Sequence, residues 1–159
     1  MEKKKTPIKL VDAIVARPTF GINYREKAIY AEPTGKGNLL IIEGYFGRQF
    51  RSSQECVDEE LDRFSEMYLD LCRKFDEDPS HEYCEVLAYN ELYFLHGVLP
   101  NVAGGDWGYT NTPDYRISGG IEFNRRMVTD GLWREQFGED FYYYCPKEYC
   151  VPDACYLEV

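Results

Sequence analysis

The sequence has no long hydrophobic run, and this absence excludes the simplest kinds of membrane attachment. No stretch approaches the roughly 18 apolar residues of a membrane-spanning helix. The chain starts with a basic run, but the apolar stretch that follows is short and is interrupted by Lys9 and Asp12. A signal peptide needs an uninterrupted apolar region. We therefore expect a soluble, cytoplasmic protein with no membrane partner.

Glycine-rich phosphate-binding motifs are also missing. Neither G-x-G-x-x-G nor G-x-x-x-x-G-K-S/T occurs, so the pair Gly104 and Gly105 indicates no nucleotide fingerprint. An excess of basic residues is missing as well, since the formal net charge is −10 and the isoelectric point is about 4.7. Nucleic acid repels such a protein at long range. Direct binding to nucleic acid is therefore not expected.

Histidine is scarce, which leaves His81 and His96 as the only histidines available for acid–base catalysis. His96 precedes Gly97 at the start of an irregular stretch and is the better catalytic candidate, with Asp106 or Glu91 to orient it. The alternative is a helix cap or an ordinary surface histidine. The sequence does not decide between them, because the outcome depends on proximity in three dimensions.

Six cysteines are present, and without export they are expected to stay reduced. Three of them follow one another at intervals of five residues, namely Cys145, Cys150 and Cys155. With His81, His96 or Cys84 as a fourth ligand, these three are a candidate zinc site. Packed thiols are the simpler interpretation, and no cofactor is expected.

The acidic residues are concentrated in one segment. Residues 53–78 hold ten acidic and three basic side chains, whereas residues 1–52 hold five acidic and ten basic ones. In the same segment, apolar residues recur at steps of four and three, a spacing that predicts one buried face of a helix over residues 53–76. This face comprises Val57, Leu61, Phe64, Tyr68, Leu71 and Phe75. The outer face is acidic and carries Asp58, Glu59, Asp62, Glu66 and Asp70.

The remaining patterns predict short strands around this helix. Strands are expected within 8–16, 23–33, 38–50 and 115–128, and a short helix within 129–138. Residues 81–97 fit either a strand, which we favour, or a helix capped by Ser80 and ended by Gly97. Ser52 and Glu55 have the spacing of a capping box at the start of the long helix. The fold class is α+β, a single domain over residues 1–159. We expect a mostly antiparallel sheet packed against one long amphipathic acidic helix, with a second short helix near the C-terminus.

Residues 97–115 show no hydrophobic period, yet they carry Trp107, Tyr109 and Tyr115. An irregular segment of this length is uncommon in a compact domain unless it binds something or moves. Trp107 with its glycine neighbours suits an exposed anchor. The alternative is that Trp107 folds back over the core.

Three hypotheses of function follow from these features. The first is a non-enzymatic binding protein whose acidic helix, together with Trp107 and Tyr109, occupies a basic surface of a partner, such as a nucleic-acid-handling protein that it inhibits. The second is a nucleotide or small-anion binder that adds Tyr115 and the arginines Arg116, Arg125 and Arg126 to the aromatic loop. The third is a small enzyme that uses His96. The sequence predicts no oligomeric state.

Overall fold

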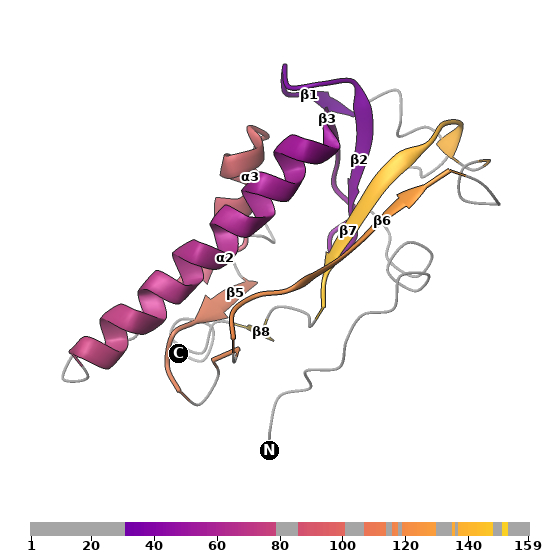
Figure 1. Cartoon of the computed structure of the whole chain (residues 1–159). Helices are drawn as coiled ribbons and strands as arrows, with labels where there is room; N and C mark the ends of the chain where they lie inside the picture. Colours follow the sequence, from indigo (N-terminus) through magenta and orange to yellow (C-terminus); the bar gives the residue numbers. More distant parts are fainter. Residues whose placement is uncertain are drawn as a thin grey trace. The chain divides into compact units, whose positions relative to one another are not determined.

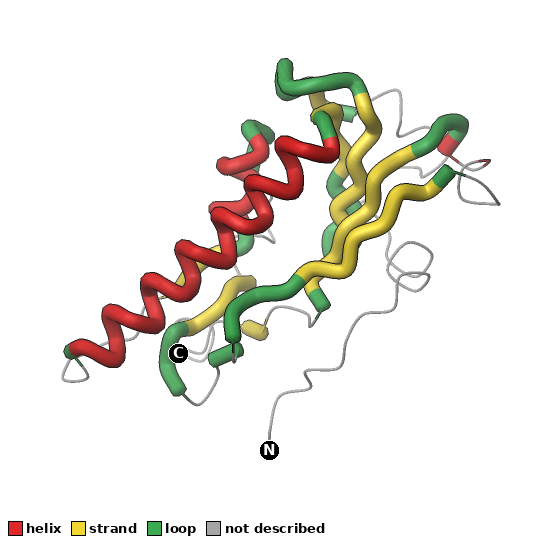
Figure 2. Tube along the Cα trace, in the orientation of Figure 1, coloured by secondary structure: helices red, strands yellow, loops and turns green. Residues whose placement is uncertain are grey.

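The computed structural model describes residues 31–78, 86–100, 107–113, 116–117, 119–129, 135 and 137–147, and the backbone of 151–152. The chain divides into two compact units, each considered by itself below. The sheet unit comprises Thr6–Asp58 and Phe123–Tyr149, and the helix unit comprises Met1–Lys5, Glu59–Glu122 and Cys150–Val159. Figure 1 labels the elements and Figure 2 separates helices from strands by colour. The described residues confirm an α+β architecture with two helices and two sheets.

The sheet unit contains a five-stranded mixed sheet in the order β1-β3-β2-β7-β6. Its strands are β1 (Glu32–Pro33), β2 (Leu39–Glu43), β3 (Gln49–Ser52), β6 (Phe123–Val128) and β7 (Phe141–Pro146). The pairs β2–β3 and β6–β7 are antiparallel, whereas β1–β3 and β2–β7 are parallel. The expectation of a mostly antiparallel arrangement therefore holds for only two of the four strand pairs of this sheet. It rested on the short connections between consecutive strands, and these do not reveal that β7 returns from far along the chain to lie parallel to β2.

The middle of this sheet is buried. Leu40, Ile41 and Ile42 are at most 1% exposed, and every residue of β7 is buried. A continuous apolar run of this kind is typical of a strand covered on both faces. After β2 the chain turns tightly, and a Cβ atom at Gly44 would collide with the hydroxyl of Tyr143. Glycine at this position therefore leaves room for the Tyr143 side chain, which comes from β7.

The same turn contains a buried carboxylate. Glu43 has no exposed surface, and its side-chain oxygens accept hydrogen bonds from the backbone amides of Tyr45 at 2.6 Å and Phe46 at 2.9 Å. A buried carboxylate needs such donors, because its charge is costly to remove from water. Glu43 thus closes the turn between β2 and β3.

The long helix α2 spans Gln54–Glu77, against an expected 53–76. The buried row consists of Val57, Leu61, Phe64, Tyr68 and Cys72. Leu71 and Phe75, which were assigned to this face, are only partly buried. The first turn is capped by Ser53, whose hydroxyl accepts a hydrogen bond from the Cys56 amide at 3.1 Å. Ser52, the expected cap, instead ends β3 as a buried residue, because the helix begins one position later than expected.

Residues 86–97 form a strand and then a helix. Strand β4 (Val86–Ala88) is followed by α3 (Asn90–His96), which ends at Gly97 in the left-handed conformation with φ of 87°. The favoured interpretation of a strand throughout 81–97 is therefore wrong after Ala88. The alternation of apolar residues holds only for the short strand, while the glycine terminator belongs to the helical alternative.

The helix unit also contains a three-stranded antiparallel sheet in the order β4-β5-β8. Strand β5 (Trp107–Thr110) lies inside the stretch that was expected to be irregular, and β8 is Val151–Pro152. A Cβ atom at Gly108 would lie 2.5 Å from the carbonyl oxygen of Leu87. The close approach of β4 and β5 thus explains one glycine of the stretch as a packing requirement.

Several expected elements lie outside the described residues. These are the strands at 8–16 and most of 23–33, and most of the short helix at 129–138. Of the strand expected within 115–128, the structure assigns residues 123–128. Neither helix of the described part of the chain combines the length and apolar character needed to cross a membrane.

Candidate functional site

The solvent-facing side of α2 carries a line of carboxylates within the helix unit. We call Glu59, Asp62, Glu66 and Asp70 the acidic stripe, and all four are exposed. Their spacing of three, four and four residues places neighbours about 5–6 Å apart on one face. Arg63 is the one basic residue between the first and last members of the stripe. The acidic stripe is therefore a concentrated negative surface on a single rigid element.

Asp70, the last member of the stripe, belongs to an ion pair. Asp70 contacts Arg73 one turn further along the helix, and both side chains are about two-thirds exposed, at 65% and 64%. Pairs this exposed contribute little, typically 0–1 kcal/mol, because water screens both charges. The pair therefore leaves both groups accessible to a partner.

Asp58 differs from the acidic stripe in its surroundings. Within the sheet unit, its Oδ1 accepts hydrogen bonds from Arg125 Nη1 at 2.9 Å and from the Tyr142 hydroxyl at 2.6 Å. Burial raises the pKa of Tyr142 to about 12, and the neighbouring Asp58 carboxylate acts in the same direction. Asp58, which was predicted to contact a partner, thus fastens the first turn of α2 to β6 and β7.

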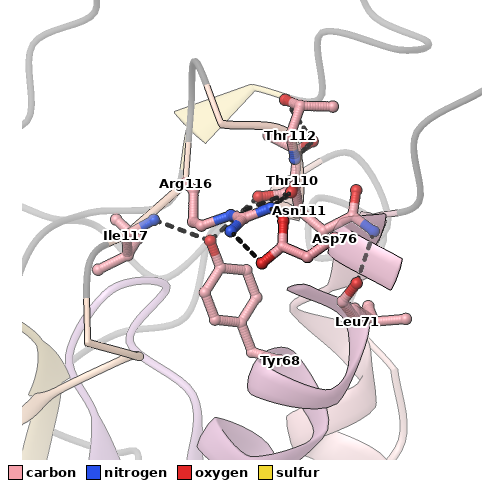
Figure 3. A network of polar contacts seen from close by, with 8 residues as sticks. All are labelled: Tyr68, Leu71, Asp76, Thr110, Asn111, Thr112, Arg116 and Ile117. Atoms are coloured by element: carbon pink, nitrogen blue, oxygen red, sulfur yellow. Dashed lines mark hydrogen bonds and ion pairs between the residues drawn. The ribbon is translucent and has the colours of Figure 1, made fainter. Parts of the chain in front are cut away.

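A polar network in the helix unit fastens the segment after β5 to α2 (Figure 3). The Tyr68 hydroxyl donates a hydrogen bond to the Thr110 carbonyl at 3.0 Å and accepts one from the Ile117 amide at 2.8 Å. The side-chain amide of Asn111 donates to the Leu71 carbonyl at 2.9 Å. Tyr68 and Leu71 of α2 are therefore hydrogen-bonded to Thr110, Asn111 and Ile117, which lie far away along the chain.

Arg116 completes this network. Its guanidinium contacts both carboxylate oxygens of Asp76 at 3.0 and 3.1 Å and donates to the Asn111 carbonyl at 2.6 and 3.1 Å. The hydrogen bonds between them lower the pKa of Asp76 and raise that of Arg116. Burial raises the pKa of the Cys72 thiol, which favours its protonated form. The network holds Asn111 and Ile117 against α2. Its arginine, Arg116, donates to Asp76 and to the Asn111 carbonyl, which both belong to the helix unit.

Of the aromatic residues in this part of the chain, the structure describes the side chain of Tyr109 but not those of Trp107 and Tyr115. Tyr109 is 1% exposed and packs edge-to-face against Phe64 and Tyr68, with ring centroids 6.1 and 5.8 Å apart. Strand β5 thus turns this ring, which was expected to contact a partner, into the core of the helix unit. The backbone of Trp107 belongs to β5, but its side chain, like Tyr115, lies outside the described residues.

His96 occupies a buried position near the end of α3. Its side chain has no exposed surface, and Nδ1 lies 2.7 Å from Glu60 Oε1. Glu60 is thus a partner of His96, for which Asp106 or Glu91 was expected, and Asp106 lies outside the described residues. Glu60 precedes Leu61 at the edge of the apolar row of α2, a position that could have marked it as a partly buried carboxylate. A histidine without exposed surface does not suit a reaction with a substrate from solution.

The remaining candidates belong partly to the sheet unit, partly to the helix unit and partly to residues that the structure does not describe. Arg125 is bonded to Asp58 and Arg126 is exposed, and both belong to the sheet unit, whereas Arg116 belongs to the helix unit. Cys145 is a buried free thiol in β7, while Cys150, Cys155, Cys84 and His81 lie outside the described residues. Among the described residues, no three potential ligands of histidine, cysteine, aspartate or glutamate gather to hold a metal ion.

Comparison with known proteins assigns neither a family nor a function to the chain. No protein-family model, no curated protein and no solved structure matches the chain. Any function must therefore be argued from the surfaces and contacts of the chain itself.

Proposed function

We propose that this chain is a non-enzymatic binding protein whose acidic stripe occupies a basic surface of a partner macromolecule. The observation that supports this function most is the exposure of four carboxylates in one line along α2. Asp70 lies eleven positions after Glu59, which corresponds to about 16 Å along the helix axis. A basic groove on a partner protein is the natural counterpart of such a line.

The rigidity of the helix supports the same proposal. The side of α2 opposite to the acidic stripe carries Leu61, Phe64 and Tyr68, and none of these three has any exposed surface. The bonds from Tyr68 and Leu71 to the segment after β5 hold the helix further. Charges on an element that is already ordered lose little conformational entropy on binding. Concentrated charge also attracts an oppositely charged partner from a distance and speeds association.

The narrower form of the proposal concerns the kind of partner. Carboxylates spaced about 5–6 Å apart along a rigid helix approximate the charge pattern of a nucleic-acid strand. The partner is accordingly a protein that handles nucleic acid, and the chain inhibits it by occupying its Lys- and Arg-lined groove. The net charge of −10 supports this form, because it opposes direct binding of nucleic acid by the chain itself.

The test is capture of partners from an extract of the native host by three immobilised proteins. The first is the wild type, and the second carries the neutralising substitutions Glu59→Gln, Asp62→Asn and Glu66→Gln in the acidic stripe. The third is a control of equal net charge with three exposed acidic residues outside the stripe replaced, by Asp78→Asn, Glu122→Gln and Glu135→Gln. The bound proteins are quantified by mass spectrometry.

The expected result is a basic protein that the wild type and the control retain and the stripe variant loses. Three exposed ion pairs of about 0.2–1 kcal/mol each correspond to a loss in affinity of roughly tenfold. Double-stranded DNA should displace the captured protein, since both compete for one groove. Equal capture by all three proteins contradicts the proposal, and capture that DNA does not displace contradicts its narrower form.

The alternative of a nucleotide or small-anion site has less support. Arg116 already donates to Asp76 and to the Asn111 carbonyl, and Arg125 donates to Asp58. An incoming phosphate would have to replace these acceptors. The enzyme hypothesis has less support as well, because His96 is buried against Glu60.

A further inference from the structure

We draw no further inference here: the strongest candidate, the exposed apolar surface of Phe94 in α3 and of Leu99 just after that helix, carries no proposal, because nothing in the described part of the chain shows what would cover it.

Discussion

Replacing Tyr68 with phenylalanine removes one oxygen atom from the interior of the helix unit. That oxygen joins α2 to two other points, the Thr110 carbonyl at 3.0 Å and the Ile117 amide at 2.8 Å. Thr110 is 1% exposed and Tyr68 has no exposed surface, so little water can replace the lost bonds. The substitution leaves the ring packing against Tyr109 unchanged, because it removes only the hydroxyl. Its effect therefore measures the polar network and not the apolar core.

The size of the loss in stability follows from the two groups that lose a bond to Tyr68, the Thr110 carbonyl and the Ile117 amide. Each intramolecular hydrogen bond contributes about 0.5–1.5 kcal/mol, and a buried group that loses its only bond costs about 1–3 kcal/mol. For one carbonyl and one partly buried amide, we expect the free energy of unfolding to fall by about 2–4 kcal/mol. That is a large share of the roughly 5–15 kcal/mol that stabilises a typical domain.

Urea denaturation followed by circular dichroism gives the change in free energy. Amide hydrogen exchange supplies a local readout, since the Ile117 amide should exchange faster in the variant. The exchange of β2 and β7 amides serves as the comparison within the same sample. A loss below about 0.5 kcal/mol, together with unchanged exchange at Ile117, would refute the assignment of Tyr68 as the link between α2 and this segment.

Two further predictions concern pH and the buried histidine. The pKa of Tyr142 is raised from 10.0 to about 12, so its contribution to stability is present below pH 10 and is lost as the pH rises toward 12. Urea denaturation at stepped pH should show this decline, with a shallower slope in Tyr142→Phe. For His96→Ala we expect a loss of about 2–4 kcal/mol, from the cavity and the lost bond to Glu60. Glu60→Gln, which can still bond the imidazole, should cost about 1 kcal/mol in the same denaturation assay; equal losses would contradict this account.

The long helix could be predicted because its signal is local. Val57, Leu61, Phe64 and Tyr68 recur at helical spacing, and these four are fully buried in α2. The cap was misplaced by one residue because Ser52 and Ser53 are both suitable caps, and only the end of β3 decides between them. Local periodicity thus determines the face of a helix better than its first residue.

The sheet and the network around Tyr68 could not be predicted in the same way. Strand β7 pairs in parallel with β2, about a hundred residues away along the chain, and no local pattern encodes that partner. Nothing in the sequence around Asn111 or Arg116 indicates that they bond Leu71 and Asp76, because those contacts exist only once the segment lies against the helix. The prediction for residues 86–96 was wrong after Ala88 for another reason. A short apolar run fits the period of a strand and that of a helix, and the change from strand to helix falls inside this run.

The internal pairing of arginine explains why a surface of this chain can be so strongly negative. The chain has 18 lysines and arginines against 28 acidic residues. Besides the exposed pair Arg73–Asp70, four described arginines lie within 3.0 Å of a carboxylate in their own unit, as Arg48–Glu32, Arg51–Glu139, Arg116–Asp76 and Arg125–Asp58. Each pair is neutral as a whole, so these four arginines hold parts of the fold together without offsetting charge elsewhere. The excess of carboxylates is then found at exposed positions such as the acidic stripe. Water hydrates each charge there, so its desolvation costs little free energy.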